Sequence, residues 1–222
     1  MELEQFQSSN AAEESEETFQ LENSYTLDVA VSGSVMAKAG SMIAYTGDLS
    51  FTGKSSAEGG ITGFIKEAAT SEGTPVMEVE GEGHVYLADQ EKKVQVLSLD
   101  RGEEITVNGE DVVAFESSVD YEISTIDSLA GAVAGGLTNV YLKGPGNVAI
   151  GVHGDPLVLT PPVQTDPGAT VAWSGTTPDI KSNRSLGDMV GQESGERYQM
   201  HFKGSSGFVV VQPYEELPSG SG

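Results

Sequence analysis

Apolar and polar residues alternate over short stretches of this chain, and glycine or polar residues separate each stretch from the next. An alternation with a period of two predicts half-buried β-strands. We expect strands at 27–31, 94–99, 119–123 and 157–159, and closing pairs at 76–79 with 84–88, 140–143 with 148–152, and 198–202 with 208–212. Weak helical or glycine-rich segments are expected at 61–69, 126–133 and 186–190. The pattern predicts an all-β fold with few short helices.

Three apolar runs end in an alanine that is followed by an aromatic residue. They are AGSMIAYTG, NGEDVVAFES and PGATVAWSG, with the pairs Ala44-Tyr45, Ala114-Phe115 and Ala172-Trp173. A glycine-led, β-branched run follows each of them, with its glycine at Gly83, Gly146 and Gly207. Because the signals keep their order while the spacer varies, we expect three internal repeats, at about 23–93, 94–154 and 155–214. The repeats would form one β domain over 23–214, stacked or arranged in a ring.

The chain resembles the altered-inheritance-of-mitochondria protein 24 family over about residues 25–214. The resemblance lies in GGITGFIKEA, GEGHVYLA, VNGEDVVAFESSVDYEI, GGLTNVYLKGPGNVAI, PGATVAWSGTTPDI and FKGSSGFVVVQP. It implies a double-stranded β-helix-like or sandwich-like fold related to the tryptophan RNA-binding attenuation protein, with three internal repeats. In this family, fungal relatives are tied to mitochondrial inner-membrane organisation, and prokaryotic relatives have no established activity. The resemblance therefore implies no recognised catalytic set.

The composition is strongly acidic. The 222 residues include 34 Asp+Glu, 11 Lys+Arg and no Cys, and the formal net charge is −23. Such a surface repels phosphate backbones and anionic lipids, which argues against nucleic-acid partners and membrane insertion. The lack of cysteine excludes disulfides, thiol catalysis and iron–sulfur clusters. A composition with dispersed carboxylates and few lysines resembles that of proteins from salt-accumulating halophiles. In those proteins the high salt concentration screens the repulsion between carboxylates. We therefore expect a halophilic, archaeal-type member of the family rather than a calcium-sequestering protein, which would group its carboxylates.

The two ends of the chain differ from the middle. Residues 1–22 are acidic and contain no basic residue, and residues 215–222 are rich in Glu, Gly and Ser, so both predict disordered tails. The N-terminus lacks the apolar region of a secretory signal, and the weakly polar stretch 129–137 is too short to span a bilayer. We expect a cytoplasmic protein.

Two glycine-rich segments, Gly81-Glu82-Gly83 and Gly144-Pro145-Gly146, resemble half of a dinucleotide-binding fingerprint. Tyr86 and Ala149 replace the third glycine and a strand follows, so no helix N-terminus would meet a pyrophosphate. Structural turns with positive φ explain both segments. Similarly, Gly204-Ser205-Ser206-Gly207 resembles a nucleophile elbow but leads into a strand. Carboxylate pairs, as in glycosidases, carry little information among so many acidic residues.

The three histidines, His84, His153 and His201, have no metal-binding spacing. His84 and His201 could meet if the first and third repeats were neighbours in a closed ring. A metal would then need a carboxylate such as Asp155 or Glu82 to join them. Surface or capping histidines are the simpler interpretation, so no catalytic, cofactor-binding or metal-binding residue is assigned and no cofactor is expected.

Tyr45, Phe115 and Trp173 hold equivalent positions and either fill the same core layer in each repeat or form a three-part aromatic pocket. The glycine-rich segment 131–136 permits close backbone approach and is a candidate subunit contact. We therefore expect a non-enzymatic β-scaffold or binding module that acts through a homo-oligomer or a protein partner. The alternative is a protein, or an enzyme, with a small-ligand or metal site between repeats.

Overall fold

The structure is a computed structural model, and it describes residues 1–12, 17–54, 76–125, 138–182 and 198–216. Within these residues it contains strands β1 to β16, one short helix and two 3-10 turns, which confirms the all-β prediction. The helical segments expected at 61–69, 126–133 and 186–190 lie outside the described residues, and so does the candidate subunit contact at 131–136.

The strands form three antiparallel sheets. In the first sheet the order is β3-β4-β2-β7-β10-β5, with β1 paired to β2; its strands are β1 (Phe19–Asn23), β2 (Thr26–Lys38), β3 (Met42–Lys54), β4 (Val76–Leu87), β5 (Lys93–Leu99), β7 (Val112–Glu116) and β10 (Gly146–Val152). In the second the order is β11-β16-β13-β6-β9-β8; its strands are β6 (Glu104–Asn108), β8 (Asp120–Thr125), β9 (Thr138–Lys143), β11 (Leu157–Leu159), β13 (Thr170–Ser174) and β16 (Phe208–Val211). The third, ordered β12-β15-β14, contains β12 (Val163–Thr165), β14 (Pro178–Ser182) and β15 (Tyr198–Phe202).

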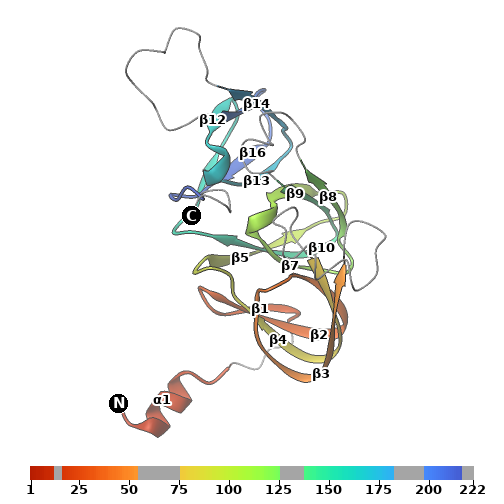
Figure 1. Cartoon of the computed structure of the whole chain (residues 1–222), viewed down its shortest axis with the longest axis vertical. Coiled ribbons are helices and arrows are strands. Elements are labelled where there is room, and N and C mark those ends of the chain that lie inside the picture. Colours follow the sequence, from red (N-terminus) through yellow and green to blue (C-terminus); the bar gives the residue numbers. More distant parts are fainter. Residues whose placement is uncertain (13–16, 55–75, 126–137, 183–197, 217–222) are drawn as a thin grey trace.

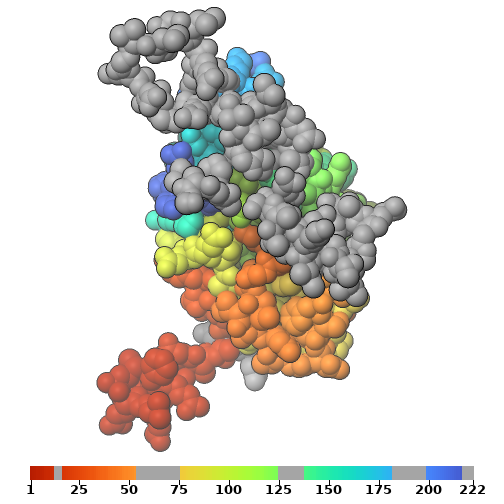
Figure 2. Space-filling view, in the orientation of Figure 1, coloured from red at the N-terminus to blue at the C-terminus, as the bar shows by residue number. Residues whose placement is uncertain are grey.

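The molecule is elongated, with β1–β4 at one end and the β12–β14 sheet at the other (Figure 1). The apolar faces of the sheets bury three clusters. One is centred on Val29, Val79 and Val85, the second on Phe115, Val140 and Leu142, and the third on Trp173, Met200 and Phe202. Helix α1 (Leu3–Ser9) has no buried residue and stands clear of the strands in Figure 2.

Glycines allow β2, β3 and β4 to curve together. Gly33 pairs with Gly81, Gly47 pairs with Gly83, and all four have positive φ. A Cβ atom at Gly81 would lie 2.0 Å from the carbonyl oxygen of Asp48. Only glycine therefore permits this close approach and backbone conformation. The turn predicted at Gly81-Glu82-Gly83 is wrong, because these residues lie inside β4, which joins the two strands expected at 76–79 and 84–88.

The three alanine–aromatic pairs share one register. Ala44, Ala114 and Ala172 lie opposite Tyr86, Ala149 and Val210, and in each strand the residue before the alanine is skipped in the pairing. The three skipped residues are Ile43, Val113 and Val171. Each partner residue also follows a glycine by three positions. Tyr86 follows Gly83, Ala149 follows Gly146 and Val210 follows Gly207. Each pair therefore belongs to the same kind of bulged antiparallel ladder.

The ordered structure extends beyond the expected boundaries at both ends. Strand β1 begins at Phe19, whose side chain is 5% exposed and pairs across to Val29, so part of the segment 1–22 is a strand. At the other end the backbone N–H of Glu216 donates to the carbonyl oxygen of Gly168 at 2.9 Å. Burial of one apolar side chain and a backbone hydrogen bond thus hold residues that composition alone assigns to tails.

Candidate functional site

A groove lies on the polar face of the second sheet. Alternation along β6, β9 and β8 turns Ile105, Val140 and Ile123 toward the core and the residues between them toward the other face. On that face the pairings align Trp173, Thr106, Tyr141 and Glu122 in one row across four strands. The row forms the floor of the groove.

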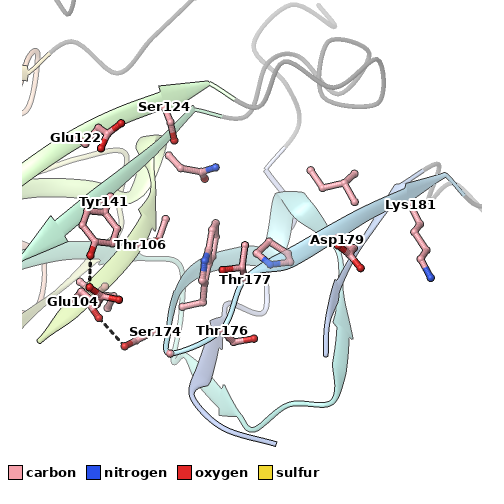
Figure 3. Close-up of a pocket in the computed structure, with 16 residues that line it drawn as sticks. Glu104, Thr106, Glu122, Ser124, Tyr141, Ser174, Thr176, Thr177, Asp179 and Lys181 are labelled. Carbon is pink, nitrogen blue, oxygen red and sulfur yellow. Dashed lines mark hydrogen bonds between the residues drawn. The ribbon is translucent and has the colours of Figure 1, made fainter. Parts of the chain in front are cut away.

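The segment from Ser174 to Lys181, which includes most of β14, forms the opposite wall (Figure 3). The volume of this open groove is about 1060 Å³. Figure 3 shows Glu122, Ser124 and Tyr141 on the sheet side and Thr177, Asp179 and Lys181 on the β14 side. The groove therefore lies at the junction of the second and third expected repeats, where our alternative interpretation placed a pocket.

Side-chain size explains why this junction is open. At the junction of β2 and β7, Met36 lies opposite Phe115 and both side chains are buried. The ring of Phe115 also contacts that of Tyr121, with centroids 5.0 Å apart. In the groove the position of Met36 is held by Thr106, which lies opposite Trp173, and the position of Tyr121 is held by Pro178. Smaller side chains leave space that Met and Tyr fill in the other junction.

The groove is negatively charged. Glu104, Glu122 and Asp179 line it, and Lys181 is the only basic residue among its described lining residues. The Tyr141 hydroxyl donates a hydrogen bond to the Glu104 carboxylate, and this bond raises the pKa of Tyr141. On the β14 side, the hydrogen bond from Lys203 lowers the pKa of Asp179.

The backbone around Glu104 is tied to the neighbouring strand as well. The hydroxyl of Ser174 donates to the carbonyl oxygen of Glu104 at 2.6 Å, which fixes the end of β13 beside β6. Carboxylates, hydroxyl groups and aromatic rings in one groove suit a ligand that carries positive charge and hydrogen-bond donors.

The sequence did not point to these lining residues. Glu104 and Glu122 are two carboxylates among 34, so no spacing separates them from the rest. The available signal was the alternation in β9, where Asn139 and Tyr141 flank the buried Val140. A single aromatic residue on the polar face of a strand is common and does not by itself indicate a binding surface, so this signal was weak.

The structure does not bring the histidines together. His84 lies on β4 in the first sheet and His201 on β15 in the third. Figure 1 shows β4 near one end of the molecule, and β12 and β14, which flank β15 in its sheet, at the other. The Nδ1 atom of His84 lies 3.0 Å from both carboxylate oxygens of the buried Asp28. Nε2 of His153 is 3.6 Å from Oε1 of Glu216. Among the described residues, no group of three or more His, Asp or Glu side chains is arranged to hold a metal.

The carboxylates considered as partners for these histidines are engaged elsewhere. Asp155 forms an ion pair with Lys93 at 2.6 Å, and the carboxylate of Glu82 accepts a hydrogen bond from Ser32 at 3.2 Å. The glycine–serine segment 204–207 connects β15 to β16. It is therefore a connection between strands of two different sheets, and it leads into a strand, as expected.

The three aromatic residues do not form one pocket. Phe115 and Trp173 are buried in separate clusters. Tyr45, in contrast, is 50% exposed and packs edge-on against Phe51, so its expected place in the core is wrong. The reason is that β7 and β13 each add to a further strand, whereas the described chain pairs β3 with β4 alone.

A buried charge cluster was also missed. The ammonium group of Lys92 contacts Asp111 at 2.7 Å and Glu216 at 2.6 Å, and it donates to the carbonyl oxygen of Glu110 at 2.9 Å. Lys38 donates to the same carbonyl oxygen at 2.9 Å. These residues come from segments far apart in the sequence, so spacing gave no sign that they meet. The cluster ties the C-terminal residues to the rest of the fold.

Comparison with known proteins identifies the relationship of the chain. The model of a family described as "Mitochondrial biogenesis AIM24" matches residues 19–214. The crystal structure of a Streptococcus pyogenes protein, determined in a structural genomics programme, is similar with a TM-score of 0.67 and 21% identity. The similarity covers 89% of this chain and 93% of that protein. No curated protein sequence matches the chain. Among the described residues, no helix has the length and apolar character needed to cross a membrane.

Proposed function

The chain belongs to the Mitochondrial biogenesis AIM24 family, and we propose that it acts as a non-enzymatic binding module for an extended, positively charged polypeptide segment. The observation that carries this proposal is the open acidic groove between the β6–β9–β8 face and β14. The corresponding junction between β2 and β7 is filled by buried side chains.

The dimensions of the groove favour a polypeptide over a compact metabolite. Its volume of about 1060 Å³ lies just above the range for small-molecule sites, about 300–1,000 Å³. In the described chain β14 pairs with β15 alone, so one edge of β14 has backbone groups available. An extended segment beside such an edge gains main-chain hydrogen bonds, and its side chains reach the floor.

The negative charge of the groove favours a positively charged partner. Glu104 and Glu122 line the groove on the sheet side, so a lysine or arginine in the groove is attracted to their carboxylates, whereas Asp179 on β14 already forms an ion pair with Lys203 (Figure 3). An acidic segment would be repelled by these side chains and by the net charge of −23. The specific expectation is a basic segment with small polar residues that fit beside Trp173.

The test uses Trp173 as its own reporter, because it is the only tryptophan in the chain and it lines the groove. A synthetic peptide of alternating lysine and serine is titrated while tryptophan fluorescence is recorded, at the lowest KCl concentration that keeps the native circular dichroism. The proposal requires a saturable change that Glu122→Gln weakens severalfold. Asp48→Asn is the matched control, since Asp48 is an exposed carboxylate on β3 that does not line the groove.

Three outcomes would overturn the proposal. The glutamate–serine analogue could bind as tightly, Asp48→Asn could weaken binding as much as Glu122→Gln, or no peptide could bind. The polyamine spermidine is included because a small cation that binds as tightly as the peptide would favour the small-ligand interpretation instead.

We also propose that the chain is built from three repeats with a fold like that of the tryptophan RNA-binding attenuation protein, and that it works in a salt-rich cytoplasm of a halophilic, archaeal type. The shared register of Ala44, Ala114 and Ala172 supports the repeats. The excess of 34 acidic over 11 basic residues supports the adaptation to salt, because carboxylates repel one another weakly when salt screens them.

A further inference from the structure

Two junctions inside the chain are built by the same pairing rule. Strand β7 adds to β2 with Ala114 opposite Ala37, and Phe115 lies opposite Met36. Strand β13 adds to β6 with Ala172 opposite Val107, and Trp173 lies opposite Thr106. In both cases an alanine–aromatic strand pairs with the strand that directly precedes a short turn.

The third alanine–aromatic strand lacks this partner. In the described chain the first part of β3 pairs only with β4. Its bulged residue Ile43 is 59% exposed, whereas the corresponding residues Val113 and Val171 are fully buried. Met42 and Tyr45 are exposed too, although the residues at their positions in β7 and β13 are buried.

A hollow of about 590 Å³ lies beside Ile43 and is also lined by Tyr25 and Gln90. The edge of β3 therefore presents apolar side chains, unpaired backbone groups and empty space at one end of the molecule. In the two internal junctions, a strand of the preceding unit covers this same surface.

The complementary half of the junction lies at the other end of the molecule. Strand β12 precedes the 3-10 turn η2 (Pro167–Ala169), just as β6 precedes η1 (Gly109–Asp111). An aspartate or asparagine caps each turn: the side chain of Asp166 accepts from Gly168 N, and that of Asn108 accepts from Glu110 N. Yet β12 pairs with β15 alone in the described chain, whereas β6 has β9 on one edge and β13 on the other.

We infer that a second copy of this chain completes the junction, with its β12 added to the free edge of β3. The register of the two internal junctions places Gln164 of one copy opposite Tyr45 of the next, and Thr165 opposite Ala44. The contact is head-to-tail, so it produces a ring if the rotation closes and a filament if it does not. It buries Met42, Ile43 and Tyr45 in the way that their counterparts are buried inside one chain.

The choice of a second copy as the occupant follows from the repetition of the interface. The chain already forms this contact twice with itself, and within the described residues the two unmatched halves lie at its two ends. Because each copy is strongly acidic, salt should strengthen the association by screening their repulsion. The inference concerns the β3 and β12 edges and does not depend on what the groove beside β14 binds.

Cysteine cross-linking tests the register directly, because the chain contains no cysteine. Tyr45→Cys and Gln164→Cys are prepared as separate proteins, mixed in concentrated KCl, oxidised and separated without reductant. Directly opposed residues of neighbouring strands have Cβ atoms about 4.5–5.5 Å apart, close enough for a disulfide with a small adjustment. We expect a linked dimer in the mixture and not in either protein alone.

The control mixture pairs Gln164→Cys with Val158→Cys. Val158, on β11, is an apolar residue that is 62% exposed, comparable to Tyr45 at 50%. Cross-linking of Tyr45→Cys with Gln164→Cys at the level of this control would overturn the inference. So would a wild-type protein that light scattering shows to be monomeric at every concentration and KCl level. Ile43→Lys should shift the association to at least tenfold higher protein concentration, whereas Val158→Lys should not.

Discussion

The ammonium group of Lys92 lies 2.7 Å from the carboxylate of Asp111, at a place where both side chains are only 1% exposed. Glu216, six residues before the end of the sequence, contacts the same ammonium group at 2.6 Å. Burial disfavours the charged form of Lys92, but the two carboxylates outweigh it and raise the pKa of this lysine. One buried cation thus joins the β4–β5 connection, η1 and the C-terminal segment.

Replacement of Lys92 by methionine should destabilise the protein by about 3–5 kcal/mol, because the buried Asp111 loses its cationic partner. Chemical denaturation in KCl at about pH 8.5, above the pKa of about 7 of Asp111, measures the effect. The neighbouring Lys93 provides the control, since its ion pair with Asp155 is exposed and Lys93→Met should change the unfolding midpoint little. Equal effects of the two substitutions would show that the buried pair has no special role.

The pH dependence of stability should carry the signature of Asp111. Burial raises the pKa of Asp111 to about 7 from 3.8, against the opposing attraction of Lys92. Between these values the folded protein binds a proton that the unfolded chain has released. The resulting stabilisation is complete below pH 4 and is lost as the pH rises to about 7. Its size is about 4 kcal/mol at most.

Asp111→Asn removes this titration, so the free energy of unfolding of the wild type relative to the variant should fall between pH 4.5 and 7. The pKa of Glu216 is lowered, because its hydrogen bond from Lys92 outweighs the effect of burial. This shift makes stability fall at low pH, and it does so in both proteins. The charged groups that face Asp111 are Lys92, Lys38 and Glu216. Denaturation curves that stay parallel with pH for the two proteins would contradict the assignment.

The sequence was sufficient for the strands but not for the way in which they join. Alternation located β5 and β9, because one face of each strand is buried and the other is not. Positive φ at Gly81 and Gly83 is shared by turns and by sharply curved strands, so composition could not distinguish them. Only the pairing of Gly47 with Gly83 shows that β4 continues through this point.

The groove and the charge cluster could not be predicted for a related reason. Both depend on contacts between residues distant in sequence, such as Lys92 with Glu216. The groove arises because Thr106 stands where the other junction has Met36, and that correspondence is visible only in the strand register.

Thr106→Met should therefore close the groove. The longer side chain would occupy the space beside Trp173, as Met36 does beside Phe115. We expect at least a tenfold loss of affinity for the lysine–serine peptide, measured by Trp173 fluorescence, with the thermal midpoint unchanged or higher because the added methylene groups become buried. Thr106→Val keeps the volume and should retain binding. Full binding by Thr106→Met would place the peptide elsewhere.

The stability of the whole chain should depend on salt. At about 0.1 M salt the Debye length is about 10 Å, so the carboxylates that produce the net charge of −23 repel one another across the surface. At about 1 M the length is about 3 Å and the repulsion is largely screened. The urea midpoint should rise steeply with KCl up to about this concentration.

A triple variant separates screening from the general effect of salt on apolar surface. Asp48→Asn, Glu80→Gln and Asp120→Asn neutralise three exposed carboxylates on β3, β4 and β8. If repulsion limits stability, the variant should be more stable than the wild type at 0.1 M KCl and lose that advantage at 2 M. Salt exclusion from apolar surface acts on both proteins alike, so equal slopes for the two against KCl would refute screening as the cause. The same comparison bears on the proposed salt-rich cytoplasm, since only a chain limited by its own charge gains from such a solvent.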